Sequence, residues 1–237
     1  MVEASVAPAE GAVKKKAYHH GDLRNAIIQE AIARARVSGE KAIVLREIAP
    51  HIGVSATAAY RHFANRQQLV EEVASRGFVE MIERVEAAAA AAGAGDEPGT
   101  VLASYLQLRC AALAVVEFSI EEPAWARTMM ENLGISEVVR ARADDINAVL
   151  QSLIDRGVEA GTFVGGTVVN DELSLWAAID GLSAQAMYGI RSMSTPSAAR
   201  ASARTIDLCL TDLLTEEGLR VRDEVSEPGD IAADAEG

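Results

Sequence analysis

The sequence predicts an all-α protein in which a small N-terminal module of three helices precedes a larger helical body, with about nine helices in total. Three observations support this prediction. The composition is rich in alanine and includes only six prolines. Apolar residues recur every three or four positions along most of the chain, and the alternation typical of strands is scarce. Glycines and small polar residues separate the periodic segments, as expected at helix ends.

Length and composition are those of a soluble globular protein with two modules. The chain has 237 residues, of which 49% are hydrophobic and 24% charged, as is ordinary for soluble domains. No apolar run reaches the roughly 18 residues of a membrane span. The N-terminal lysines follow a weakly apolar stretch, which is not the order of a signal peptide. We therefore expect a cytoplasmic protein that does not contact membranes.

The first helix is expected to run from Asp22, as its cap, to Ser38. Apolar side chains at a spacing of four form its inward stripe: Leu23, Ile27, Ala31 and Ala35. A stripe of this width buries one face of a helix against its neighbours. This helix would brace the segment that follows.

Residues 45–63, LREIAPHIGVSATAAYRHF, read as two short helices joined by a turn at Gly53. Glycine can adopt the positive φ that ends the first helix, and Ser55 can cap the second. Pro50 lies inside the first helix, and Val44 stands where a side-chain cap is usual, so we expect that helix to be short or kinked. The pattern is that of a helix-turn-helix, which makes duplex DNA the first partner to consider.

The charge distribution supports this interpretation although the net charge is −13. Residues 14–66 contain ten Lys and Arg against four Asp and Glu, which gives +6 and leaves −19 for the remainder. Screening confines electric fields to about 8 Å at physiological salt, so a basic face on an acidic body can still attract DNA. The Lys14–Lys16 run would be a basic arm along phosphates, or else a solvated flank.

The segment 18–73 resembles the DNA-binding domain of TetR/AcrR transcriptional regulators, through its succession IA…GVS…YRHF…L. Residues 175–182, LWAAIDGL, resemble the Trp-His-Gly signature of one subgroup, except that Asp180 replaces its histidine. The resemblance implies a homodimeric repressor on a palindromic operator, released by a small apolar or amphipathic effector. The alternative is a ligand-independent dimeric DNA-binding or architectural protein, whose C-terminal domain only dimerises or binds a protein partner.

The resemblance and the residue chemistry together assign the DNA contacts. Arg46 is the expected base reader, because a guanidinium can bind both O6 and N7 of guanine; alternatively, it forms a surface salt bridge. Small side chains let the second motif helix enter the major groove, and the residues after it reach the DNA backbone. The candidates are Lys16, Arg46, Ser55, Ala56, Thr57, Tyr60, Arg61, His62 and Arg66.

The body is predicted to begin with a helix that Asn65 caps and that continues to Gly93. Further helices are expected at 100–116, 123–133, 137–156, 171–191 and 196–214. The resemblance implies that the last two form a dimer interface through Leu175, Ile179, Leu182, Ala186, Ala199, Ala203, Ile206, Leu210 and Leu213. Large or polarisable side chains are placed around an effector cavity, each with plain core packing as the alternative: Tyr105, Arg109, Phe118, Trp125, Met129, Trp176 and Met187.

The predicted domains are a disordered tail at 1–13, the helix-turn-helix domain at 14–64, a regulatory and dimerisation domain at 65–215, and an acidic disordered tail at 216–237. We expect no enzyme, cofactor or metal. The pair His19-His20 lacks the spacing of a helical metal site, and two distant cysteines suggest neither a disulfide framework nor a metal site. The sequence does not identify the effector, the operator or the direction of regulation.

Overall fold

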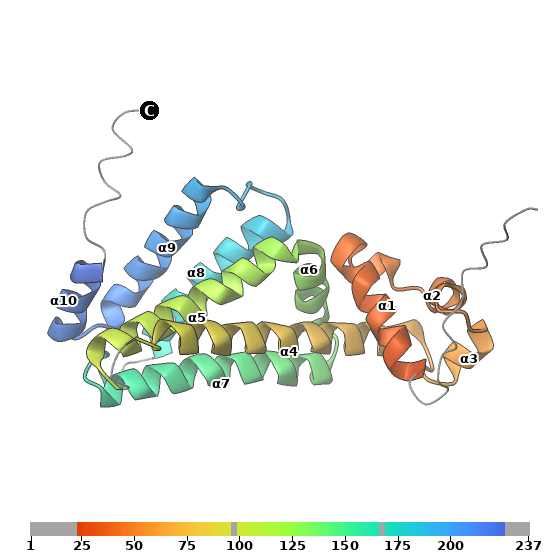
Figure 1. The fold of residues 1–237 in the computed structure, drawn as a ribbon, viewed down its shortest axis with the longest axis horizontal. Helices are drawn as coiled ribbons and strands as arrows, with labels where there is room; N and C mark the ends of the chain where they lie inside the picture. Colours follow the sequence, from red (N-terminus) through yellow and green to blue (C-terminus); the bar gives the residue numbers. More distant parts are fainter. Residues whose placement is uncertain (1–22, 96–98, 166–168, 226–237) are drawn as a thin grey trace, which may run out of the picture.

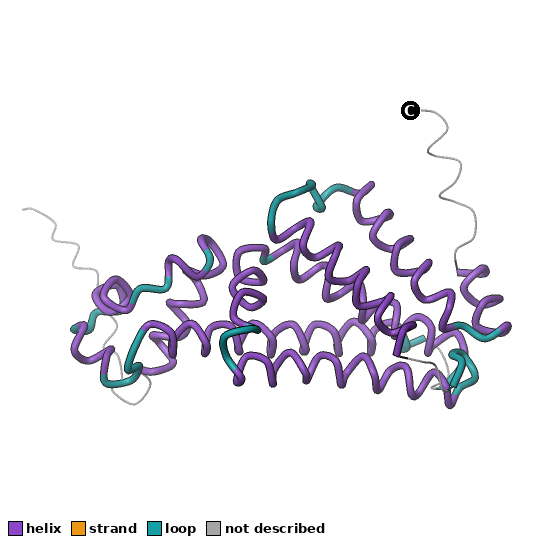
Figure 2. The backbone as a smooth tube through the Cα atoms, turned by 180° about the vertical axis from the view of Figure 1, so that it is seen from behind, coloured by secondary structure: helices purple, strands orange, loops and turns teal. Residues whose placement is uncertain are grey.

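In a computed structural model of the chain, residues 23–95, 99–165 and 169–225 are described, together with the side chains of all but residues 169–172. These residues form ten α-helices and two 3-10 helices, and no strand (Figure 2). The all-α prediction is confirmed, with one α-helix more than expected. The predicted N-terminal tail, the basic arm with Lys16, the His19-His20 pair and the Asp22 cap lie outside the described residues.

The N-terminal module contains α1 (Leu23–Ser38), the 3-10 helix η1 (Glu40–Ala42), α2 (Leu45–His51) and α3 (Ala56–Tyr60). The predicted stripe of α1 is buried at Ile27, Ala31 and Ala35. The turn glycine, Gly53, has a φ of 81°. As expected, α2 is short, with seven residues, an internal Pro50 and no side-chain cap.

One helix joins this module to the body. The helix α4 (Arg66–Ala92) has 27 residues, which corresponds to about 40 Å at 1.5 Å per residue. The Asn65 side chain accepts a 2.9 Å hydrogen bond from the Gln68 amide, so the predicted cap is present. Figure 1 shows α4 running from the N-terminal module along the length of the body. Movement of its N-terminal end therefore moves the module.

The body packs helices around α4. The helix α7 lies alongside α4, α5 packs on α4 and α8, and α6 sits next to α1 (Figure 1). Its elements are α5 (Val101–Glu121), α6 (Pro123–Asn132), α7 (Glu137–Glu159), α8 (Val169–Met187), α9 (Pro196–Leu210), the 3-10 helix η2 (Thr211–Leu213) and α10 (Glu216–Val225).

By length and composition, α5 meets the criteria for a membrane span, contrary to the expectation from the sequence. About half of its residues are buried among the other helices, including Tyr105, Leu108 and Phe118. Its Arg109 is paired with Asp207 of α9. The helix is therefore the central core helix of the bundle.

The prediction that the chain is disordered from Glu216 onward is wrong for residues 216–225, which form α10. Thr215 caps this helix by accepting a 3.1 Å hydrogen bond from the Gly218 amide, and its hydroxyl donates to the Gly161 carbonyl at 2.7 Å. Gly218 is packed so closely that a Cβ there would overlap the Thr162 carbonyl. This cap and close packing dock an acidic segment onto the body. Residues 226–237 lie outside the described residues.

Candidate functional site

The α2–α3 end of the N-terminal module presents most of the predicted DNA-contacting side chains. Five of the exposed ones form what we call the α2–α3 tip: Arg46, Thr57, Tyr60, Arg61 and His62. Beneath them, Ala59 and Phe63 are fully buried and anchor α3. Ser55 caps α3 by accepting a 3.2 Å hydrogen bond from the Ala58 amide, and Ala56 is half-buried.

Ion pairing leaves the positive charge of the module concentrated at this tip. Most cations of the module are neutralised within the chain, in the pairs Arg24–Glu72, Arg34–Glu30, Arg36–Glu80 and Arg66–Glu40. Within residues 23–66, the cations without an ion pair to a described residue are Lys41, Arg46 and Arg61. An unpaired exposed cation is available to a phosphate or a base edge.

The structure gives Arg66 a different role from the predicted phosphate contact. Its Nε donates to the Ile43 carbonyl at 3.0 Å, and its two terminal nitrogens bind the side chain and carbonyl of Glu40 at 2.9 and 2.5 Å. The side chain therefore ties the start of α4 to the segment before α2. For Arg46, the alternative of a surface salt bridge is absent among the described residues.

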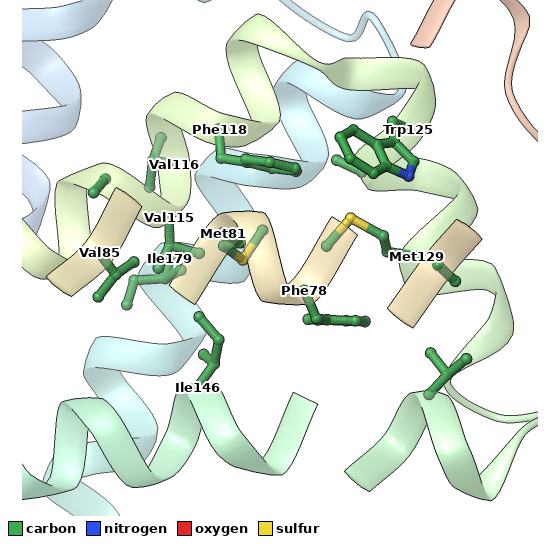
Figure 3. Packing of buried hydrophobic residues seen from close by; sticks show 14 of the residues in the cluster. Phe78, Met81, Val85, Val115, Val116, Phe118, Trp125, Met129, Ile146 and Ile179 are labelled. Atoms are coloured by element: carbon green, nitrogen blue, oxygen red, sulfur yellow. The ribbon is translucent and has the colours of Figure 1, made fainter. Parts of the chain in front are cut away.

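The body holds a cavity of about 870 Å³ between α4, α5, α6, α7 and α8. This volume lies within the usual range for small-molecule sites. In Figure 3, Phe78 of α4 and Ile146 of α7 point into the space between their helices, and Met81 and Met129 lie nearby. The walls are mainly apolar and include Phe78, Met81, Val115, Met129, Leu133, Ile146, Leu150, Trp176 and Met187.

Three predicted effector residues, Met129, Trp176 and Met187, line this cavity. The placement is wrong for Phe118 and Trp125. Their rings pack against each other with centroids 5.9 Å apart (Figure 3), and the Trp125 indole donates to the Val73 carbonyl at 3.0 Å. Both side chains are core residues.

The placement is also wrong for Tyr105 and Arg109, which bind Asp207 of α9. The Arg109 Nε lies 2.5 Å and the Tyr105 hydroxyl 3.1 Å from one carboxylate oxygen of Asp207. Burial, followed by the neighbouring carboxylate, raises the pKa of the Tyr105 phenol. The hydrogen bonds that Arg109 donates to the Asp207 carboxylate raise the pKa of Arg109. This cluster joins α5 to α9 and holds the Arg109 guanidinium away from the cavity wall.

Sequence reasoning missed the polar residues of the cavity wall, and two of them lie together on α8. Asp180 and Ser183 of α8 both line the cavity, and burial raises the pKa of the Asp180 carboxyl. The Ser183 hydroxyl is buried without a hydrogen-bond partner. The signal was in the sequence, because both positions lie on the helical face of Trp176 and Met187, at steps of three or four residues.

The helix α6 contacts both the cavity and the N-terminal module. Its inner side contributes Met129 and Leu133 to the cavity wall. Its other side reaches η1 through Asn132, whose amide donates to Glu40 at 3.0 Å and accepts from Gln67 of α4 at 3.0 Å.

A second joint between module and body centres on Arg36 of α1. Its guanidinium lies 4.6 Å above the ring centroid of Trp125 on α6. It also pairs with Glu80 of α4 at 2.7 Å and with Glu122, the residue before α6, at 3.0 Å. A displacement of α6 would therefore change the contacts that hold α1 and η1 against the body.

Five of the predicted dimer residues are buried in the chain's own core: Leu175, Ile179, Ile206, Leu210 and Leu213. Assigning them to a partner contact is wrong, because each is at most 1% exposed. Leu182, Ala186 and Ala203 are half-buried, and Ala199 is exposed. The most apolar stripe of each helix faces inward, and a different stripe is left on the surface.

These features define a class of protein. A three-helix module with a cationic helix-turn-helix tip is joined by one long helix to a helical body with an apolar cavity. This organisation is typical of DNA-binding transcription regulators.

The comparisons with known proteins give a family match for the N-terminal module and a similar fold for the chain. Residues 28–73 match the family model described as bacterial regulatory proteins, tetR family. The N-terminal module therefore belongs to the TetR family, and the chain has the fold of its members. No curated protein matches the sequence. The subgroup with the Trp-His-Gly signature stays a prediction.

Three solved structures illustrate the similarity of the fold. A protein of unknown function from Rhodococcus sp. RHA1 is 23% identical, with a TM-score of 0.67 over 84% of this chain and 100% of that one. A tetR-family transcriptional regulator from Streptomyces coelicolor is 16% identical, with a TM-score of 0.60 over 92% and 95%. A protein from Saccharomonospora viridis, assigned as a transcriptional regulator and solved in complex with choline, is also 16% identical, with a TM-score of 0.58 over 82% and 99%.

Proposed function

We propose that the chain is a homodimeric transcriptional repressor, acting in the cytoplasm, which leaves its operator when a small molecule occupies the cavity. The observation that carries this proposal is the double role of α6. The same ten-residue helix forms part of the cavity wall and holds α1 and η1 through Trp125 and Asn132. A ligand that moves α6 or the adjoining part of α4 would reorient the α2–α3 tip.

DNA binding would rest on the tip. Arg46 is the proposed base reader, and Tyr60, Arg61 and His62 are the proposed backbone contacts, because all four are exposed and neither arginine is held by an ion pair within the described residues. Thr57 and the half-buried Ala56 would contact bases through small side chains. A predicted contact from Lys16 falls outside the described residues.

Dimerisation would use the exposed stripes of α8 and α9. On α8 the exposed Ala177 and Gly181 lie four residues apart, and on α9 the exposed Ala201 and Leu208 lie seven apart. Leu208 is 65% exposed and offers an apolar side chain to a partner. Small residues beside it would let two copies approach closely. Two copies would bring two recognition helices to the half-sites of a palindromic operator.

A pair of charge substitutions tests the dimer. Leu208→Glu should convert the protein to a monomer in sedimentation velocity and reduce operator affinity, because it places two carboxylates in the interface. The control is Ile135→Glu, at a residue that is 68% exposed between α6 and α7. A dimeric Leu208→Glu protein, or loss of the dimer in both variants, would contradict the proposed interface.

Footprinting on the DNA next to the coding region, followed by a thermal-shift screen of metabolites, tests regulation. A compound that stabilises the protein should also release the footprint, because it binds in the cavity and shifts α6. The complex of the S. viridis protein with choline supports the use of this fold to hold small molecules. Compounds that stabilise the dimer without changing operator affinity would favour the ligand-independent alternative.

A further inference from the structure

Building on the proposed function, we infer that the effector of this cavity is a monocationic amphiphile: an organic ammonium compound with an apolar body. The inference comes from the charge and geometry of the cavity wall. Among the described lining residues, Asp180 carries the only formal charge, and none is lysine, arginine or histidine. An apolar cavity with one carboxylate favours a ligand with one positive charge.

The carboxylate lies on one stripe of α8 with the other groups that a cation would use. Trp176, Asp180, Ser183 and Met187 follow one another at steps of four, three and four residues, which places them on one helical face, and all four line the cavity. An indole ring attracts an ammonium group electrostatically. The stripe therefore offers a carboxylate and an aromatic ring one helical turn apart.

Asp180 pairs with no cation among the residues that the structure describes. None of the ion pairs between described residues includes it, and no described residue hydrogen-bonds its side chain. The residue is exposed at the rim of the cavity wall, and partial burial of its carboxyl raises the pKa of that group. A bound ammonium group would supply the missing counter-charge, because an opposite charge favours the ionised carboxylate.

A second unpartnered polar group belongs to the same wall. The Ser183 hydroxyl is buried, with the residue 5% exposed, and makes no hydrogen bond to a described residue. Buried polar groups are nearly always hydrogen-bonded. Because this oxygen has almost no accessible surface, a ligand would reach it only after the Ser183 side chain turns toward the cavity. As it stands, the site gives the ligand one ionic contact, at Asp180.

The same wall disfavours anionic effectors. A carboxylate or phosphate in the cavity would lose its hydration, meet no lysine or arginine, and face the Asp180 carboxylate. Arg109, which the sequence analysis placed around the cavity, is bound to Asp207 instead. The remaining surface, with Phe78, Met81, Met129 and Leu150, suits an aromatic or aliphatic body.

Calorimetric titration of the full chain with three matched probes tests the inference. The probes are 4-phenylbutyltrimethylammonium, its neutral analogue with carbon in place of nitrogen, and 5-phenylpentanoate. The cation should bind at least about tenfold more tightly than the neutral analogue, which corresponds to about 1.4 kcal/mol, and the carboxylate least. Asp180→Asn should remove the preference for the cation. The control Asp212→Asn removes an exposed carboxylate outside the cavity and should leave the preference intact.

The outcomes separate this inference from the proposed function. Equal binding of the cation and the neutral analogue, an undiminished preference in Asp180→Asn, or no binding of the cation would overturn the inference. Binding of the neutral analogue that releases operator DNA would still support the proposed function. Conversely, the cation could bind in a way that requires Asp180 and yet leave the footprint unchanged. That result would support the inferred ligand class and contradict ligand-controlled release.

Discussion

Replacing Arg36 by alanine removes the cation that joins α1 to both α4 and the start of α6. The guanidinium donates to both oxygens of Glu80, at 2.7 and 2.9 Å, pairs with Glu122 at 3.0 Å and lies 4.6 Å above Trp125. Glu80 would keep Arg84 as a partner at 2.8 Å. Glu122, whose side chain is 15% exposed, would lose its cation.

The expected loss for Arg36→Ala is about 2 kcal/mol of unfolding free energy. Because the Arg36 side chain is 37% exposed, each ion pair contributes at most about 1 kcal/mol. The stacking on Trp125 adds roughly 0.5–1 kcal/mol. For a protein of this length, a loss of about 2 kcal/mol lowers the Tm by roughly 4–8 °C.

Urea unfolding followed by tryptophan fluorescence, together with calorimetry, measures this loss. The control is Arg76→Ala on α4, which removes an exposed i,i+4 pair with Glu72 at 3.1 Å and should cost less than about 0.5 kcal/mol. The joint would be refuted if both variants lost equally little. If Arg36 also transmits the ligand signal, its alanine variant should release operator DNA less completely at saturating ligand.

Three further predictions concern DNA reading, packing and pH. Arg46→Ala should weaken operator binding and relax discrimination at one base pair by about 1–3 kcal/mol, whereas Tyr60→Ala should weaken binding to operator and random duplexes alike; equal losses on both duplexes for Arg46→Ala would refute its role as a reader. Gly157→Ala should lower the unfolding free energy by about 1–2 kcal/mol in denaturant titrations. The added methyl group would collide with the Phe163 ring, and this overpacking costs more than alanine gains in helix propensity over glycine. Unchanged stability would contradict that packing. The folded pKa of Tyr105 is raised, so the contribution of its neutral phenol to the free energy of unfolding is fully present below the unfolded pKa of about 10 and is lost as the pH rises through the folded pKa. In Tyr105→Phe, the free energy of unfolding should therefore fall less steeply at alkaline pH. The same alkaline pH dependence in the wild type and the variant would argue against this contribution.

The elements that could be predicted from the sequence are those with local signals. Asn65, Thr100 and Thr195 each cap the helix that follows by accepting a backbone hydrogen bond, and such bonds depend only on neighbouring residues. The turn at Gly53 was likewise predictable, since it needs a positive φ. For the same reason, the helix-turn-helix was found at its correct position.

The sequence could not show what each apolar helix face packs against. Periodicity identifies the apolar face of a helix, but it does not say whether that face contacts this chain or a second copy. Ile179 and Ile206 were assigned to a second copy, yet they fill the chain's own core. On α7, Val138 is 61% exposed whereas its neighbour Val139 is buried. Side-chain size also misled, because Phe118 packs beside the cavity while the smaller Asp180 and Ser183 line it.

The central claim is that the α2–α3 tip binds duplex DNA through cations that the rest of the module leaves unpaired. Fluorescence anisotropy of a duplex from the region next to the coding sequence, titrated with the full chain at several salt concentrations, tests it most directly. The logarithm of the binding constant should fall linearly with the logarithm of salt, with a slope of about −0.9 for each phosphate neutralised, and Arg61→Ala should make the slope shallower. Absence of binding, or binding that does not respond to salt, would contradict the claim.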